Sequence, residues 1–185
     1  MHFPFDIKKA IAATALLITE HKSRHLKRLR LQKLLYIAEK ESLRLAGSPI
    51  VGDALSAMKH GPVLSHTLNL MRGNEIDAEW SMYFATKGHD LILLQNPGVD
   101  ELSHFEVATL KQAARKHLTH TVWTIRDLTH EFPEWKSHYI EGTSRPIPLT
   151  DILRESGRSD DEAREVVFRA EYEMAFKKKF AHTSK

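Results

Sequence analysis

Cysteine is absent from this chain of 185 residues, which excludes disulfide bonds and thiolate chemistry. Long apolar runs are absent as well, because the longest, residues 10–18, is shorter than the roughly 20 residues that a helix needs to cross a bilayer. Residues 1–5 lack the charged and then apolar layout of a secretory signal peptide. We therefore expect a cytoplasmic protein that makes no contact with a membrane.

The sequence lacks a strong excess of either positive or negative charge. The formal net charge is +3 with the histidines neutral, which is less basic than a dedicated nucleic-acid binder usually is. The chain has 12 histidines, so nucleic-acid binding seen only at mildly acidic pH would say little about function. The charge balance therefore disfavours a nucleic-acid partner.

Sequence motifs that are typical of phosphate binding, nucleophilic catalysis or metal binding are missing too. The 8 glycines are scattered and form no phosphate-binding loop, and no serine or threonine stands in a nucleophile elbow. Two histidine pairs, His21 with His25 and His117 with His120, have helical spacing, but no third ligand accompanies either pair. We expect no enzyme activity, no cofactor and no metal site.

Helical periodicity is the main positive signal. Residues 26–46 carry apolar side chains at the spacing of one helical face, and Gly47 is placed to end that helix in a left-handed conformation. This face consists of Leu31, Leu34, Leu35, Ala38 and Leu45. Periodicity and capping residues predict further helices at about 7–21, 63–71, 103–117, 121–130, 150–155 and 159–180.

A β-hairpin interrupts the predicted helices. Residues 82–86 and 90–94 are rich in aromatic and branched side chains and flank Gly88, which suits a tight turn. Residues 51–57 are ambiguous between a short strand and a helical turn. Gly61 and Pro62 indicate a helix start, with Pro62 at the first helical position. The expected fold class is mostly α with a small antiparallel β element, a compact single helical domain with one β-hairpin.

Three motifs resemble those of a known family. They are Leu31-x-Lys33-Leu34-Leu35-Tyr36, then Ala57-x-Lys59-x-Gly61-Pro62-Val63, and last Thr129-His130-x-x-Pro133-x-Trp135. In this order, with a glycine-proline stretch near Gly47 and Pro49 between the first two, they resemble the Panacea domain, also called the SocA-like antitoxin domain. The resemblance covers about residues 5–150. We therefore predict a Panacea domain over residues 1–149 and a C-terminal helical extension, residues 150–185, packed on it.

The resemblance implies an antitoxin of a bacterial or phage-associated toxin–antitoxin system. Such a protein would neutralise a cognate protein toxin by direct binding, or act as a proteolytic adaptor that hands the toxin to the ClpXP protease. The alternative is a DNA-binding regulatory protein that uses the basic segment, residues 22–33. This segment has no acidic residue and contains Lys22, Arg24, Lys27, Arg28, Arg30 and Lys33. It also fits a solvated helix face or a docking patch for an acidic protein.

Polar side chains interrupt the apolar motifs at Lys33, Tyr36, Lys59 and His60. Because buried polar atoms need hydrogen bonds, these residues either hold neighbouring loops together or form a partner-binding cluster. Both interpretations stay open from the sequence. For Trp135 we expect an indole packed in the core, with its N–H bonded to a nearby carbonyl.

The last predicted helix carries two apolar lines, which one flat core cannot cover together. The first line suits docking on the core and consists of Ala163, Val167, Ala170 and Met174. The second lies largely on the other side and consists of Phe168, Tyr172, Phe176 and Phe180. Either other elements of this chain cover the second line, or Phe168, Tyr172 and Phe176 contact a toxin or, in a homo-oligomer, a second copy of the chain.

Overall fold

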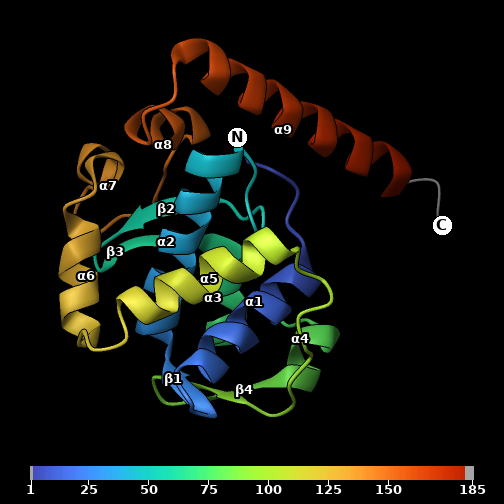
Figure 1. Cartoon of the computed structure of the whole chain (residues 1–185), viewed down its shortest axis with the longest axis vertical. Helices are drawn as coiled ribbons and strands as arrows, with labels where there is room; N and C mark the ends of the chain where they lie inside the picture. Colours follow the sequence, from blue (N-terminus) through green and yellow to red (C-terminus); the bar gives the residue numbers. More distant parts are fainter. Residues whose placement is uncertain (1, 182–185) are drawn as a thin grey trace.

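The computed structural model describes residues 2–181, with side chains up to residue 179. Over this range the chain forms nine α-helices and two small antiparallel sheets of three strands each (Figure 1). The predicted fold class, mostly α with small antiparallel β elements, is confirmed.

The central element is α2, Arg28–Ala46, and other helices pack around it (Figure 1). Its neighbours include α1 (Ile7–Glu20), α5 (His104–Lys116) and α6 (Val122–His130). The apolar face of α2 is buried as predicted, except that Leu45 is 50 % exposed. Leu45 differs because it lies in the last turn of α2, where residues 44–46 are all exposed. Gly47 follows with a φ of +62° and ends the helix as expected.

The first sheet contains the predicted hairpin. Strands β4 (Phe84–Lys87) and β5 (Asp90–Leu93) pair with each other, and β1 (His25–Lys27) adds a third strand on β5. Residues 82 and 83, predicted as strand, instead end a short helix, α4 (Ala78–Tyr83). The side chain of Asp77 caps α4, and this cap favours helix in a stretch whose aromatic residues alone indicate a strand.

The second sheet was not predicted from the sequence. Strands β2 (Leu55–Met58) and β3 (Gly61–Leu64) form a second hairpin, and the short β6 (Arg145–Pro146) pairs with β2. The prediction that Pro62 opens a helix is wrong, because Pro62 lies in β3 and α3 (Ser65–Arg72) begins only at Ser65. Because β3 is an edge strand, a proline without an N–H group is tolerated there.

The chain ends in three further helices: α7 (Pro133–His138), α8 (Leu149–Glu155) and α9 (Asp160–Ala181). Helix α9 crosses the top of the molecule in Figure 1 and extends past the body of the fold. The guanidinium group of Arg158, just before α9, donates to the carbonyl oxygens of Leu43 and Arg44 at 3.0 and 3.1 Å. These bonds join the start of α9 to the end of α2.

The docking face of α9 agrees with the predicted line. Ala163 and Ala170 are buried, Val167 and Met174 are half-buried, and Val166 joins this face. Helix α9 therefore packs on the fold through one side. The division of the chain after residue 149 stays a prediction.

Candidate functional site

Lys33 joins α2 to the β2–β3 hairpin. Its side chain is fully buried, and its Nζ donates a hydrogen bond to the carbonyl oxygen of Pro62 at 2.6 Å. Burial lowers the pKa of Lys33 to about 7, because the ammonium group loses its hydration. No carboxylate among the described residues pairs with this group. Gly61 leaves room for it, since a Cβ at that position would lie 2.9 Å from Nζ.

Tyr36 and Lys40 share one acidic partner. The Tyr36 hydroxyl donates to Oε1 of Glu134 at 3.0 Å, and Lys40 Nζ contacts both oxygens of the same carboxylate at 2.8 and 2.9 Å. Glu134 lies in α7, so this contact joins α2 to the third motif. Tyr36 is fully buried, and burial raises its pKa well above the usual value. Its place in this structure is therefore in the core.

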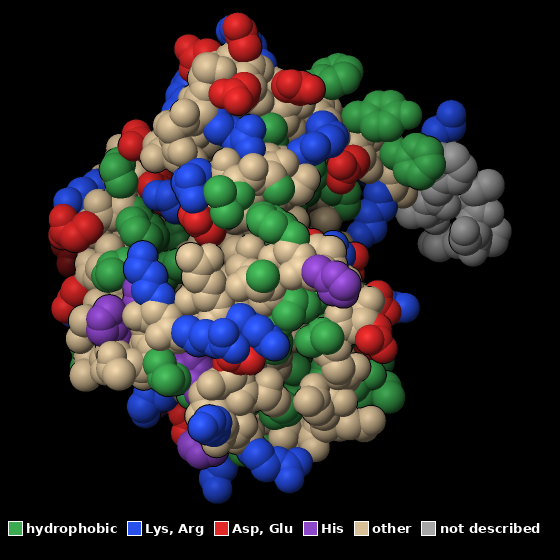
Figure 2. All heavy atoms as spheres, viewed as in Figure 1, with side chains coloured by type: hydrophobic (Ala, Val, Ile, Leu, Met, Phe, Trp, Pro, Cys, Tyr) green, Lys and Arg blue, Asp and Glu red, His purple; other side chains and the backbone are tan. Residues whose placement is uncertain are grey.

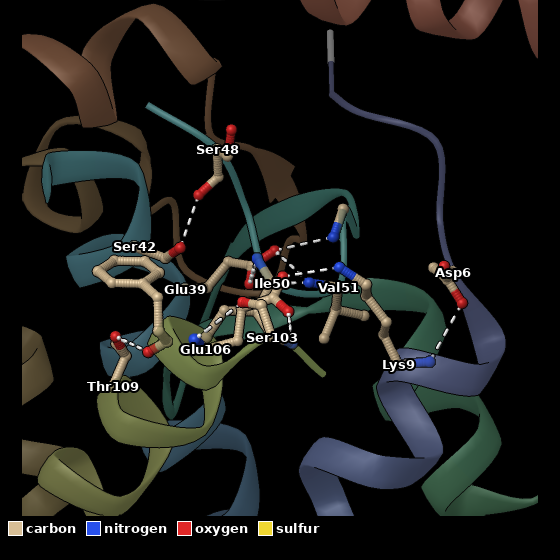
Figure 3. Close-up of polar contacts among 12 residues, drawn as sticks. Asp6, Lys9, Glu39, Ser42, Ser48, Ile50, Val51, Ser103, Glu106 and Thr109 are labelled. Carbon is tan, nitrogen blue, oxygen red and sulfur yellow. Dashed lines mark hydrogen bonds and ion pairs between the residues drawn. The ribbon is translucent and has the colours of Figure 1, made fainter. Parts of the chain in front are cut away.

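Glu39 holds the loop that follows α2 (Figure 3). Its buried carboxylate accepts hydrogen bonds from the backbone N–H groups of Ile50, Val51 and Gly52, at distances of 2.8 to 3.3 Å. Burial raises the pKa of Glu39 to about 7, although the three N–H donors act in the opposite direction. The loop that follows the glycine-proline stretch of the family pattern is thus fixed to α2 by one acidic side chain.

Trp135 joins the third motif to the same hairpin. Its indole Nε1 donates to the carbonyl oxygen of Met58 at 3.0 Å, in agreement with the expected backbone partner. The indole ring stacks on His130, with 4.2 Å between ring centroids, and on Tyr139, with 4.7 Å. All three motifs therefore meet in one region, which we call the hub: α2, the β2–β3 hairpin and residues 129–136.

Several hub residues were missed from the sequence, although a signal was present. Gln32, Glu39 and Lys40 lie at helical spacing along α2, beside its apolar face. Gln32 accepts a hydrogen bond from the N–H of Leu64 at 3.0 Å, so it also fixes the hairpin. Glu134 lies between Pro133 and Trp135 of the third motif, but only the fold brings it to α2.

A pocket of about 590 Å³ opens beside the hub, between the start of α2, the β2–β3 hairpin, α3 and the start of α6. We call it the hub pocket. Its apolar lining includes Leu29, Val63, Leu68, Val122 and Trp123. Its cationic lining consists of Lys27, Arg28, Lys33, Lys59 and Arg72. The predicted residues Lys59 and His60 are exposed at its edge, and burial together with neighbouring cations lowers the pKa of His60.

Most of the basic segment is bonded within the chain. Arg24 donates to the carbonyl oxygen of Leu94 at 3.2 Å, and Arg28 to that of Met71 at 3.2 Å. Arg30 donates to the carbonyl oxygens of His117 and His120. These guanidinium groups act as links between elements. With Lys33 buried, Lys22 and Lys27 remain as the exposed lysines of the segment.

The second apolar line of α9 stays exposed in this fold. Phe168 is 70 % exposed, Tyr172 64 % and Phe176 54 %, and the rings of Tyr172 and Phe176 stack on each other. Figure 2 shows hydrophobic side chains standing out from the surface over α9. The side chain of Phe180 lies outside the described part of the chain. We call Phe168, Tyr172 and Phe176 the aromatic line.

A groove of about 420 Å³ runs beside the aromatic line. It lies between the end of α2 and α9, and Phe168 and Tyr172 form part of its wall. Gly47 lets the two helices approach, because a Cβ there would lie 3.0 Å from Val166 Cγ2. The aromatic line therefore borders a concave surface.

The two histidine pairs differ in their surroundings. His117 and His120 lie together, with 3.0 Å between their Nδ1 atoms, whereas Nδ1 of His21 contacts the Leu17 carbonyl oxygen and His25 lies near Asp90. In the part of the chain that the structure describes, no group of three or more metal-binding side chains occurs. Over the same residues, no helix has both the length and the apolar character needed to span a membrane.

Comparison with known families agrees with this arrangement. The family model described as "Antitoxin SocA-like, Panacea domain" matches residues 31–136. The chain therefore belongs to this antitoxin-like family, as its motifs predicted. The matched segment begins at the apolar face of α2 and ends just after Trp135, so it contains the whole set of hub contacts between the three motifs. No curated protein and no solved structure matches this chain.

Proposed function

We propose that this protein is an antitoxin that neutralises a protein toxin by binding it directly, without catalysing a reaction. Membership of the antitoxin-like family supports the general function. The observation that carries the mechanism is the exposure of the aromatic line on a helix whose other side is already docked. Aromatic side chains are enriched among the residues that dominate binding energy at protein interfaces.

The position of the aromatic line in the chain favours a toxin-specific contact. Residues 168–176 lie beyond the family match, which ends at residue 136. The hub residues within the match are largely occupied with contacts that hold the fold, as Lys33 and Tyr36 illustrate. We infer that the shared segment supplies the scaffold and that α9 supplies contacts to one particular toxin.

The exposed hairpin turn is a second candidate contact. Lys59 and His60 are exposed at the β2–β3 turn, in contrast to Lys33 and Tyr36. Of these four predicted residues, they are therefore the two that a protein partner can reach. We assign them a supporting role, because exposed charges at the edge of an interface contribute less than buried aromatic anchors.

Co-expression tests the proposal. The product of the neighbouring gene should arrest growth when expressed alone, and this protein should relieve the arrest and purify in complex with that product. Relief should persist in cells without ClpXP, because direct binding needs no protease. Relief that requires ClpXP, or relief without a physical complex, would show that direct binding is not the mechanism.

A further inference from the structure

The hub pocket has a chemistry that toxin binding through α9 does not use. Its volume of about 590 Å³ falls in the range of roughly 300–1,000 Å³ that is usual for small-molecule sites. Much of its wall is apolar, with Val63 and Leu68 buried in the fold and Trp123 exposed at the opening. An apolar body would therefore be covered on several sides.

The charges around this pocket are of one sign. Five lysine and arginine side chains from three separate segments of the chain line it, and no aspartate or glutamate is among its lining residues. Two of the exposed ones are Lys59 at the β2–β3 turn and Arg72 at the end of α3. Such convergence of cations favours an anionic ligand, because like charges near one cavity raise its positive potential.

Lys33 distinguishes this pocket from a merely basic surface. It lines the cavity while its side chain is fully buried, and its Nζ has the Pro62 carbonyl oxygen as hydrogen-bond acceptor but no carboxylate partner among the described residues. An ammonium group has three donors and is costly to bury without a counter-ion. An acidic group that enters the pocket would supply the missing partner.

We propose that the hub pocket binds a small organic anion, with its acidic group paired to Lys33 and its apolar body against Val63, Leu68 and Trp123. Lys59 and Arg72 add attraction at the opening. The pocket shares Lys59 and His60 with the supporting contact at the hairpin turn but is separate from the aromatic line. The proposal therefore goes beyond the proposed function and does not depend on it.

Fluorescent dyes can test this site on the full-length protein. Anilinonaphthalene sulfonate combines one anionic group with an aromatic body, and N-phenylnaphthylamine is a closely similar dye without the sulfonate. We expect saturable binding of the anionic dye at one site per chain, at least about tenfold tighter than the neutral dye, because only the anionic dye can accept a charge-assisted hydrogen bond from Lys33. Decanoate should displace the dye. Equal binding of both dyes, or no saturable binding, would overturn the proposal.

Two sets of variants locate the site. Lys33→Met should weaken binding of the anionic dye at least about tenfold, whereas Lys22→Met, which removes the same charge outside the pocket, should leave it unchanged. The double variant Lys59→Met and Arg72→Met affects exposed side chains only and should weaken binding without changing the melting temperature. Unchanged affinity in both the Lys33→Met and the double variant would contradict the assignment.

Other occupants are distinguished by competition. If duplex DNA at physiological salt displaces the dye, the pocket is part of a nucleic-acid surface and the proposal fails. If dye binding falls as protein concentration rises, a second copy of the chain covers the pocket and the proposal also fails. Dye binding that changes neither with added duplex DNA nor with protein concentration supports a small-ligand site.

Discussion

At the scale of single residues, Lys33 lies in surroundings that are unusual for a lysine. It is buried, bonded to one carbonyl oxygen and without a carboxylate partner in the described structure, and its pKa lies at about 7 instead of near 10.5. The same side chain belongs to the first family motif and to the wall of the hub pocket. Its hydrogen bond to Pro62 serves the fold, and the proposed anion would pair with its ammonium form.

The lowered pKa of Lys33 leads to a prediction about pH. Above about pH 7 the folded chain loses a proton that the unfolded chain keeps until its pKa near 10.5, so the free energy of unfolding should rise over this interval. Between about pH 7 and pH 9 the rise should amount to roughly 1–3 kcal/mol, given about 1.4 kcal/mol per pKa unit. Denaturant unfolding of the wild type and of Lys33→Met across this range measures it. A rise of equal size in both proteins would assign the effect to another group.

Gly61 gives a second prediction at this scale. Its φ is +92°, and an added Cβ would lie 2.7 Å from Thr129 Oγ1 and 2.9 Å from Lys33 Nζ. Gly61→Ala should therefore lower the free energy of unfolding by more than about 1 kcal/mol. Gly73→Ala is the matched control, because Gly73 has a φ of +73° but no atom within 4 Å of the added Cβ. Equal losses in both variants would mean that backbone conformation alone, and not the crowded hub, requires Gly61.

At the scale of elements, the long periodic helices could be predicted from the sequence and the short elements could not. The face of α2 and both lines of α9 follow from spacing alone, because each helix repeats its pattern over many turns. The β2–β3 hairpin was missed because a Gly-Pro pair suits an edge strand as well as a helix start. The partners of Lys33 and Tyr36 lie 29 and 98 residues away, so no local pattern reveals them.

Helix α2 provides a direct test of the core. Leu34 is fully buried, so Leu34→Ala should lower the free energy of unfolding by about 2–5 kcal/mol through lost burial and the cavity left behind. Leu45→Ala on the same helix should cost no more than about 0.5 kcal/mol, because Leu45 is 50 % exposed. Thermal or denaturant melts of both variants measure the difference. Similar losses of stability in the two variants would show that α2 does not form the centre of the core.

At the scale of the whole molecule, the internal bonding of the basic segment argues against a DNA-binding role. Arg24, Arg28 and Arg30 already donate to carbonyl oxygens of this chain, so their guanidinium groups have fewer donors left for phosphate contacts. At about pH 8 and physiological salt we expect duplex DNA to bind no better than roughly 10⁻⁴–10⁻⁶ M. Fluorescence anisotropy measures this affinity. Tight, sequence-dependent binding that Lys22→Ala with Lys27→Ala abolishes would instead support a DNA-binding regulator.

The scaffold and the proposed partner surface lie in different segments of the chain. The segment that matches the antitoxin-like family contains the hub, whereas the aromatic line lies in a helix beyond it. A shared scaffold with variable additions allows related proteins to bind different partners. We therefore propose that the choice of toxin depends on the surface of α9 more than on the family motifs.

The most direct test of toxin binding through the aromatic line is the affinity for the neighbouring gene product. This affinity is compared between the wild type and the double variant Phe168→Ala with Tyr172→Ala. Isothermal titration calorimetry should give a dissociation constant at least about tenfold weaker for the double variant, with little change in melting temperature, because both side chains are exposed in the free protein. Ile76→Ala, which truncates a 90 % exposed side chain away from α9, should bind like the wild type. Equal affinities for the wild type and the double variant, or no binding by the wild type, would contradict the account.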